Sequence, residues 1–197
     1  MNDDVLQFPD FPGRETLVAR IDAAVAPGDP EQVVAALRRT LTELIDDPQV
    51  RLPDCVRRPR AERYARRELY RSPEHGYSVV AMSWAPGQGT PLHDHSGLWC
   101  VDGVWQGRLQ VTQYALLERS GDRARFRPAS TVAAARGSAG SLIPPHEYHI
   151  LHNASDDALA VSVHVYQAAM ERCAIFLPER DDWYRCQERQ LQTEADC

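Results

Sequence analysis

Residues 87 to 107 read Gly87-Gln-Gly-Thr-Pro-Leu-His93-Asp-His95-Ser-Gly-Leu-Trp-Cys100-Val-Asp-Gly-Val-Trp-Gln-Gly107. Side chains at positions i and i+2 of a β-strand share one face, so His93 and His95 project side by side. Paired imidazoles suit iron, zinc, copper and nickel, and the pattern indicates the start of a metal site. Two surface histidines on a polar strand would give the same pattern, and this alternative stays open on these two residues alone.

The composition is typical of one domain, or of one domain with an extension. The chain has 197 residues, enough for a sizeable core, and a formal net charge of -6. It has no Lys/Arg cluster on an element that would read a nucleic-acid groove, so nucleic acid is not an expected partner. No run approaches the roughly 18 apolar residues of a membrane span. The acidic start Met-Asn-Asp-Asp is unlike a signal peptide, which predicts a cytoplasmic protein with no membrane partner.

The cysteines are odd in number and scattered, at Cys55, Cys100, Cys173, Cys186 and Cys197. Without a Cys-x-x-Cys pair they resemble neither a disulfide framework nor a zinc ribbon. This usage fits a reducing cytoplasm, where disulfides are rare.

Two helices are expected near the N-terminus. Residues 14–25 mix apolar and polar side chains and end before a Pro-Gly pair. Further on, Asp29-Pro30-Glu31 offers an N-cap, a proline at the first helical position and an acid in the first turn. Apolar residues then recur at helical spacing, at Val34, Leu37, Leu41, Leu44 and Ile45. The second helix is predicted to cover one side of the structure that follows.

From about residue 64 the period changes to two. Strands rich in Val, Tyr and Trp are expected at residues 64–70, 77–84, 98–105, 108–116 and 158–166. Many short strands with closely spaced turns predict a mainly β fold, an antiparallel β-barrel or jelly roll with the N-terminal helices packed outside. We divide this single structural domain into a helical cover (1–62), a barrel (63–170) and a C-terminal extension (171–197). The extension is expected to pack loosely and to fray near Glu194.

The flanks of the first histidine pair resemble the first metal motif of the cupin superfamily. That motif has a glycine six residues before His-x-His, then a glutamate and a closing glycine. Gly87 and Gly107 match it. Cys100, however, stands where many cupins carry the glutamate ligand, so a third ligand must come from elsewhere.

A second histidine stretch, residues 144–153, resembles the second cupin motif. In that motif a proline precedes the last metal histidine by five residues and an asparagine follows it by four, as Pro144, His149 and Asn153 do here. The resemblance favours His149 as the third ligand. His146, which replaces an expected glycine, and His152 stay open as rivals, although loop or surface positions explain them more simply.

The strand expected at residues 158–166 alternates without a break. One face carries Leu159 and three valines, and the other carries Ser162, His164 and Tyr166. The polar face either meets solvent or forms a hydrogen-bonded relay that ends at the tyrosine hydroxyl.

At this point the sequence resembles the cysteine dioxygenase family of thiol dioxygenases, mononuclear non-haem iron enzymes on the cupin fold. The spacing matches without gaps from the first histidine pair to Gly107, and again from His149 to Tyr166. The resemblance implies a small thiol and O2 as partners, and we expect a monomer or small homo-oligomer. The resemblance also implies Fe(II) held by His93, His95 and His149, and a triad of Ser162, His164 and Tyr166. It makes Cys100 and Tyr166 the pair that can form a thioether crosslink, and whether this bond forms stays open.

Upstream, Tyr64-Ala-Arg66 resembles the Tyr-x-Arg of that family, whose arginine binds the substrate carboxylate. A guanidinium fork suits a carboxylate well. Matching this segment requires one inserted residue, so Arg67 is a rival of Arg66, and an exposed strand arginine is the plainer alternative.

The resemblance leaves the thiol open. The Ser-Pro-Pro that follows the tyrosine in animal-type enzymes is Gln-Ala-Ala after Tyr166, whereas bacterial 3-mercaptopropionate dioxygenases carry Gln at the position of Arg66 and Gly at that of Cys100. We predict oxidation of L-cysteine to cysteine sulfinic acid. The alternatives are 3-mercaptopropionate, or a thiol acid such as mercaptosuccinate held by Arg66 and Arg67 together. A non-oxygenase metal-binding cupin is a further alternative, and a zinc hydrolase would lack an obvious general base.

Overall fold

The structure is a computed structural model that describes residues 8–197, and it begins with two helices, α1 (Arg14–Val25) and α2 (Pro30–Asp46). The predicted start of α2 is confirmed, because the Asp29 side chain accepts a hydrogen bond from the Gln32 amide at 3.0 Å. The apolar stripe of α2 is buried. No helix among residues 8–197 combines the length and the apolar character that crossing a membrane requires.

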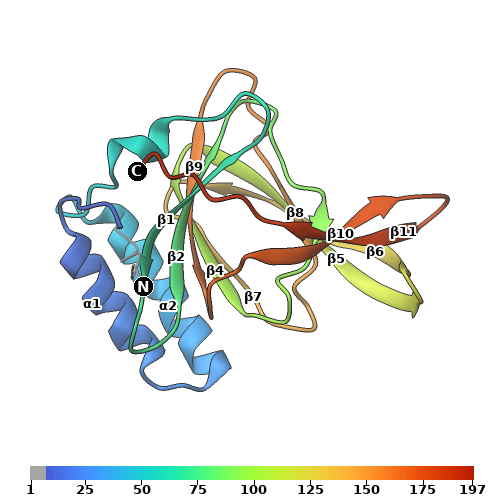
Figure 1. Cartoon of the computed structure of the whole chain (residues 1–197), viewed down its shortest axis with the longest axis horizontal. Coiled ribbons are helices and arrows are strands. Elements are labelled where there is room, and N and C mark those ends of the chain that lie inside the picture. The colour runs from blue at the N-terminus through green and yellow to red at the C-terminus, as the bar shows by residue number, and fades with distance from the viewer. Residues whose placement is uncertain (1–7) are drawn as a thin grey trace, which may run out of the picture.

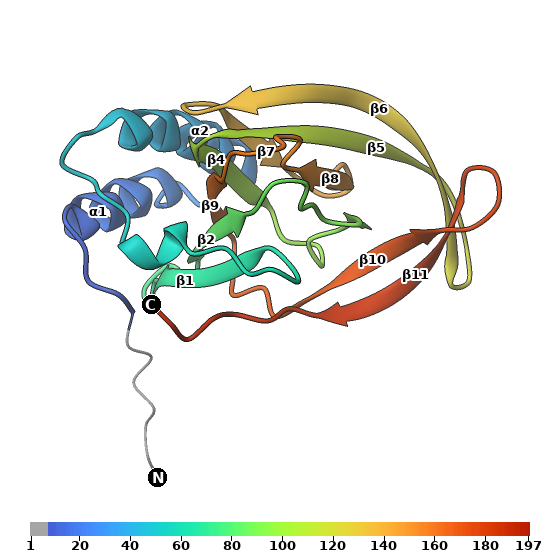
Figure 2. The ribbon, with the colours of Figure 1, turned by 90° about the horizontal axis from the view of Figure 1, so that it is seen from above.

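In the part of the chain that the structure describes, eleven strands form two antiparallel sheets, whose arrangement Figures 1 and 2 show. Neighbours in the first sheet are, in order, β1 (Ala65–Arg71), β2 (Ser78–Trp84), β9 (Ala160–Tyr166), β4 (Cys100–Gln106) and β7 (Ala139–Leu142). The second sheet closes on itself in the order β10 (Arg172–Pro178), β11 (Trp183–Gln190), β6 (Arg123–Ala135), β5 (Arg108–Ser120), β8 (His149–His152) and β3 (Leu92–His93). The predicted fold class, a cupin-type jelly roll with the N-terminal helices outside, is confirmed.

The helices cover the outer face of the first sheet (Figure 1). The valines of β9 pack there with the apolar stripe of α2 in one buried cluster. Gly103 on β4 permits this approach, because a Cβ at that position would come within 3.0 Å of Ile45 Cδ1. Strand β9 is therefore buried on both faces. Its valines face the helices, and Ser162, His164 and Tyr166 face the interior between the sheets.

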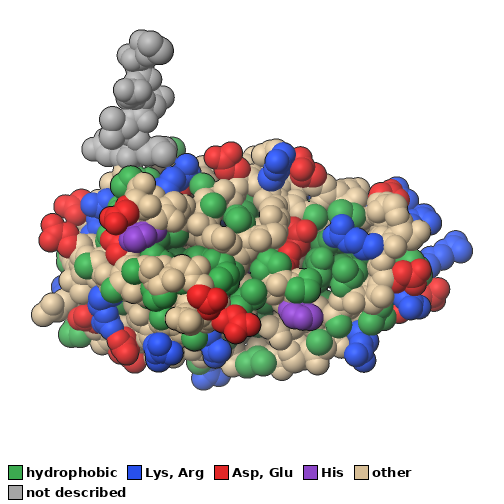
Figure 3. All heavy atoms as spheres, turned by 90° about the horizontal axis from the view of Figure 1, so that it is seen from below, with side chains coloured by type: hydrophobic (Ala, Val, Ile, Leu, Met, Phe, Trp, Pro, Cys, Tyr) green, Lys and Arg blue, Asp and Glu red, His purple; other side chains and the backbone are tan. Residues whose placement is uncertain are grey.

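Charges of both signs are mixed over the face shown in Figure 3. That face carries no basic stripe of the kind that tracks a nucleic-acid backbone, in agreement with the net charge of -6.

The expectation of a loosely packed tail is wrong. Residues 172–178 and 183–190 form β10 and β11, which pair with each other, with β3 and with β6. The segment after β11 also stays attached, since the Glu194 amide donates to the Arg66 carbonyl at 2.7 Å. The sequence indicates strand β11 only weakly, because this strand is mostly exposed and carries no alternating apolar face.

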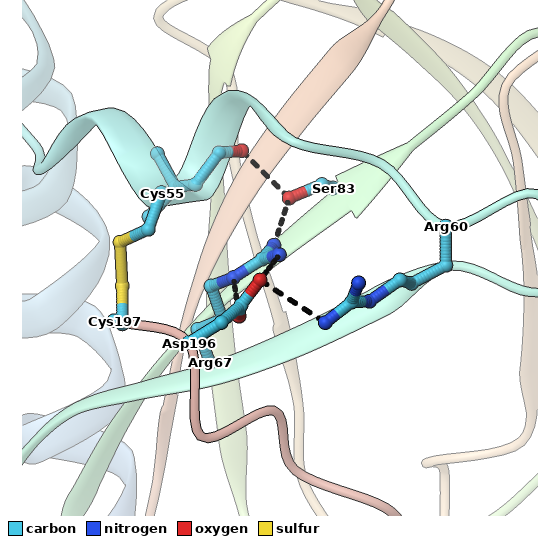
Figure 4. Close-up of a disulfide and its surroundings, with 7 residues drawn as sticks. Cys55, Arg60, Arg67, Ser83, Asp196 and Cys197 are labelled. Carbon is cyan, nitrogen blue, oxygen red and sulfur yellow. Dashed lines mark hydrogen bonds and ion pairs between the residues drawn. A yellow bond between two sulfur atoms is a disulfide. The ribbon is translucent and has the colours of Figure 1, made fainter.

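One disulfide was not expected from the scattered cysteines. Cys55, in the 3-10 turn Asp54–Arg57, forms a disulfide with Cys197 (Figure 4). Next to it Asp196 forms an ion pair with Arg67 at 2.9 Å. The count of cysteines cannot reveal a pair separated by 142 residues.

The Asp102 carboxyl should make the stability of the fold depend on pH. Asp102 on β4 is partly buried near Arg38 of α2 and Cys100, and burial raises its pKa from 3.8 to about 6, while Arg38 opposes the shift. The folded state therefore binds this proton more tightly than the unfolded state, and stability falls as the pH rises from about 4 to 6. Replacing Asp102 by asparagine should raise the free energy of unfolding at pH 7.5 by about 1–2 kcal/mol. Denaturant titrations at pH 7.5 and pH 4 check this, and a gain of the same size at both would contradict it.

Candidate metal centre and substrate pocket

Three histidines that are distant in sequence meet between the two sheets. His93 ends β3 and His149 begins β8, and these two residues are partners in the antiparallel ladder. His95 lies two residues beyond β3. The ring centroids are 4.4 to 5.5 Å apart, and one ring nitrogen from each residue lies within 4.8 Å of the others. The fold thus brings together all three predicted ligands.

Backbone carbonyls orient two of the three rings. His93 Nδ1 lies 3.1 Å from the Pro91 carbonyl oxygen, and His149 Nδ1 lies 2.9 Å from that of Glu147. A proton on each Nδ1 that is donated to the carbonyl leaves the lone pair on Nε2, which is the usual arrangement for metal-binding histidines. The Nδ1 atom of His95 is buried without a hydrogen-bond partner.

The charge state of the three rings suits a metal. Burial lowers the pKa of His93, and it lowers the pKa of His95 and His149 well below the ordinary value, with repulsion between the histidines adding to the effect. Neutral imidazoles offer lone pairs for coordination. A buried ring nitrogen without a partner is costly, and coordination would offset that cost. The donor set therefore fits a divalent first-row metal, since three imidazoles suit iron, zinc, copper or nickel.

The two rival histidines lie outside this cluster. His146 is exposed in the turn before β8, and His152 sits at the far end of β8 beside Gly89. Neither belongs to a metal-type cluster among residues 8–197.

Cys100 and Tyr166 are direct partners in the β4–β9 ladder, and both are buried. Side chains directly opposite each other in an antiparallel pair are neighbours on the same face. Burial raises the pKa of both groups well above their ordinary values, so both keep their protons. The Tyr166 ring packs edge-on against His95 with centroids 5.6 Å apart. The two residues therefore lie side by side next to the histidines, as the predicted crosslink requires.

A series of hydrogen-bonded side chains lies beside Tyr166. The Trp84 indole donates to Ser162 Oγ at 2.9 Å, and Ser162 Oγ lies 2.8 Å from His164 Nε2. Burial, assisted by nearby positive groups, lowers the pKa of His164 to about 3, so the ring is neutral. On the other side of the ring, His164 Nδ1 lies 4.0 Å from Cys100 Sγ.

This series of hydrogen bonds differs from the predicted triad in two ways. It begins at Trp84, which sequence reasoning missed as part of the site. Among the contacts described for residues 8–197, His164 and Tyr166 share ring stacking at 5.9 Å rather than a hydrogen bond. The connection from His164 to Tyr166 therefore runs by way of Cys100, the ladder partner of Tyr166, whose thiol interacts with the tyrosine side chain.

The structure separates the two rival arginines, because consecutive residues of β1 point to opposite faces. Arg66 lines the pocket and is only 3% exposed. Its Nη2 donates to the Met170 carbonyl at 3.3 Å, while Nε and Nη1 are buried without partners. Arg67 points away, donating to Asp196 at 2.9 and 3.1 Å and to Ser83 at 3.1 Å. The expectation that both could serve one substrate is therefore wrong.

Tyr64 also reaches the pocket, where its ring stacks on Trp84 with centroids 4.6 Å apart. Burial raises the pKa of Tyr64, so its hydroxyl stays protonated. Residues after β9 complete the wall, and no motif predicted them: Met170, Cys173, Ile175, Arg189 and Leu191. Within the described part of the chain, no Asp or Glu lines the pocket.

Comparison with known proteins places this geometry in a family. The family model described as cysteine dioxygenase type I matches residues 60–178. The chain belongs to the cysteine dioxygenase type I family. The matched residues carry the three histidines, both members of the Cys100–Tyr166 pair and Arg66, whereas β11 lies beyond them. Cysteine dioxygenase family membership thus confirms the resemblance and implies a metal at the three histidines.

Individual relatives of this cysteine dioxygenase family member are distant. "Cysteine dioxygenase type 1" of Danio rerio is 23% identical over 100 residues, which cover 51% of this chain and 49% of that protein. The chain thus spans about half the length of this curated relative. Two solved structures are similar. TT1209 from Thermus thermophilus has a TM-score of 0.44 and 20% sequence identity, and the match covers 59% of this chain and 94% of TT1209. A Klebsiella pneumoniae protein with a double-stranded β-helix domain has a TM-score of 0.45 and 18% identity, and the match covers 61% of this chain and 84% of that protein.

Proposed function

We propose that this chain is a non-haem iron thiol dioxygenase acting on a small thiol that carries a carboxylate, with L-cysteine as the first candidate. One observation carries the proposal. The pocket that holds the three histidines also holds a buried arginine, Arg66, whose nitrogens Nε and Nη1 have no hydrogen-bond partner among residues 8–197. A substrate anchored on Arg66 would place its sulfur beside the histidine cluster, which is a positioning effect.

The reaction balances without an external reductant, because RS⁻ and O2 together give RSO2⁻, the sulfinate. Iron(II), held by His93, His95 and His149, would supply binding and activation of the thiolate and of O2. Arg66 would grip the carboxylate through its two open N–H groups. Tyr166 lies against His95, and its hydroxyl keeps its proton because burial raises its pKa. This hydroxyl can donate a hydrogen bond to a reacting oxygen.

The hydrogen-bonded chain from Trp84 through Ser162 to His164 would hold this wall rigid. It fixes the His164 ring behind Cys100, and Cys100 in turn lies against Tyr166. A Cys100–Tyr166 thioether would join Cys100 Sγ to a ring carbon of Tyr166, with loss of the thiol hydrogen and a ring hydrogen and transfer of two electrons to O2. It would lock the tyrosine in place, and the adjacency of the two residues supports that proposal.

The second candidate substrate is 3-mercaptopropionate, which lacks the amine of cysteine. The observation that favours it is the pocket lining, which offers no carboxylate to an ammonium group among the described residues. Oxygen uptake by the iron-loaded protein with each thiol, with the sulfinate quantified, decides between them. Iron near one atom per chain with no thiol-dependent uptake would instead favour a non-oxygenase cupin.

Replacing Arg66 by glutamine should raise KM for the preferred thiol by about 10- to 100-fold, because a charge-assisted hydrogen bond to the carboxylate is lost. Cysteamine, which lacks the carboxylate, should be a poor substrate for the native protein and should be oxidised equally well by both forms. Arg127→Gln, an exposed arginine outside the pocket, is the charge-matched control and should change nothing. An equal loss of activity with cysteamine would contradict the assignment.

A further inference from the structure

A second arginine reaches the same pocket from the opposite sheet. Arg189 lies on β11, where its ladder partner is Cys173 on β10. Partners in an antiparallel ladder direct their side chains to the same face. Cys173 is buried and lines the pocket, and Arg189 lines it too, at the exposed end.

Arg189 differs from its neighbours in having no protein anion to bind. Arg172 pairs with Glu188 at 3.7 Å, and Arg185 pairs with Glu179 at 2.7 Å. Among the ion pairs and side-chain hydrogen bonds of residues 8–197, none involves the Arg189 guanidinium. Its positive charge reaches into the pocket, since it acts to lower the pKa of both Tyr64 and Cys173.

Two arginines, Arg66 and Arg189, are the cationic side chains other than histidine that line the pocket among the described residues. The described lining residues include no acid that would balance Arg66 or Arg189. Two uncompensated guanidinium groups in one pocket with low-dielectric walls favour a ligand with two negative groups.

The two arginines occupy different depths. Arg66 is buried between the sheets, whereas Arg189 is exposed at the mouth. A hollow next to the pocket is lined by both arginines together with Arg63 and Tyr64, so the space between them is continuous. One anionic group can thus sit deep on Arg66, with the thiol directed to the histidines, while a second group stays near the opening on Arg189.

We propose that Arg189 is a specificity-determining residue that binds a second carboxylate, so that the preferred substrate is a thiol bearing two carboxylates. This inference rests on the proposed thiol dioxygenase function and replaces its first candidate substrate, because L-cysteine carries only one carboxylate. Arg189 here takes the part that the sequence had suggested for Arg67, whose guanidinium is committed to Asp196 and Ser83.

Mercaptosuccinate and 3-mercaptopropionate test the proposal, because they differ by one carboxylate. Iron-loaded native protein should show kcat/KM about 10-fold or more higher for mercaptosuccinate. Arg189→Gln should remove that preference while changing kcat/KM for 3-mercaptopropionate less than 2-fold, and Arg189→Lys should keep part of it. The exposed Arg127→Gln variant is the charge-matched control. A native preference for 3-mercaptopropionate, or an equal loss for both thiols in Arg189→Gln, would overturn the proposal.

Binding measured without turnover separates this proposal from the proposed function. Calorimetry on the metal-loaded protein should show that succinate binds about 10-fold more tightly than propionate, and that Arg189→Gln abolishes the difference. If no thiol is oxidised but this difference is present, the dioxygenase assignment fails and the second anion site stands. If thiols are oxidised and the difference is absent, the second anion site fails alone.

Discussion

Replacing His149 by alanine is expected to reduce both the iron content and the rate of sulfinate formation by 100-fold or more. His149 is buried, and its ring is held by the Glu147 carbonyl so that Nε2 is available to the metal. Removing even a partner that only orients a metal ligand typically costs about 10- to 100-fold in metal affinity or activity, and removing the ligand itself should cost at least as much. Iron per chain is measured by elemental analysis, and activity by oxygen uptake.

His146 and His152 provide matched controls for this experiment. They lie in the same stretch of sequence, but outside the cluster. Alanine at either position should leave iron content and activity within about 2-fold of the native values, which is the size of effect expected away from the ligands. Loss of iron in either control, or retention of iron by His149→Ala, would show that the ligand set is different.

Replacing Cys197 by serine is expected to lower the free energy of unfolding by about 2–4 kcal/mol. The disulfide with Cys55 closes a loop across 142 residues and so restricts the unfolded chain. It also fastens the segment whose Asp196 neutralises Arg67, a side chain that is 0% exposed. For a chain of this size the midpoint of thermal unfolding should fall by roughly 5–15 °C.

The free thiols provide a direct check on the bond. Denatured, unreduced native protein should expose three thiols, those of Cys100, Cys173 and Cys186, or two in molecules where the Cys100–Tyr166 thioether has formed. Cys55→Ser should lower stability by the same amount as Cys197→Ser, and the double variant should add nothing, since all three lack the same bond. Cys186→Ser is the control and should change stability by less than about 1 kcal/mol. Five titratable thiols before reduction would contradict the pairing.

The same bond affects how the dioxygenase assays are designed. Thiol substrates can reduce disulfides by exchange, so the count of free thiols should be repeated after turnover. A rate that falls as the count rises would show that the Cys55–Cys197 link contributes to holding the pocket wall, which includes Leu191 just before the fastened segment.

Much of the site was predictable because local spacing carries it. His93 and His95 are two residues apart, and Ser162, His164 and Tyr166 alternate along one strand, so their mutual placement follows from strand geometry. The helix after Asp29 was predictable for a similar reason, since its cap and its apolar period are both local. His149, Cys100 and Arg66 came from resemblance to a family, and the fold brings them to the same interior.

Other features depend on contacts between distant segments, and local sequence does not encode these. β10 and β11 complete the second sheet although β11 lacks an alternating apolar face, because pairing partners on β3, β6 and β10 stabilise it. Arg66 enters the pocket and Arg67 does not, because consecutive residues of β1 point to opposite faces and Arg67 binds Asp196, over a hundred residues away.

The sequence by itself determined the fold class: the helices, the alternating strands and the histidine spacing are short-range patterns, and together with the resemblance to the cysteine dioxygenase family they predict a cupin-type barrel with a metal site. Only the tertiary structure decided which charges face the pocket. Arg67 is neutralised by Asp196 and removed from the pocket, and Arg189 is delivered to it by its ladder pairing with Cys173. The physical reason is that strand pairing and ion pairing join residues far apart in the chain, and the position of a charge follows from these partners rather than from its neighbours in sequence.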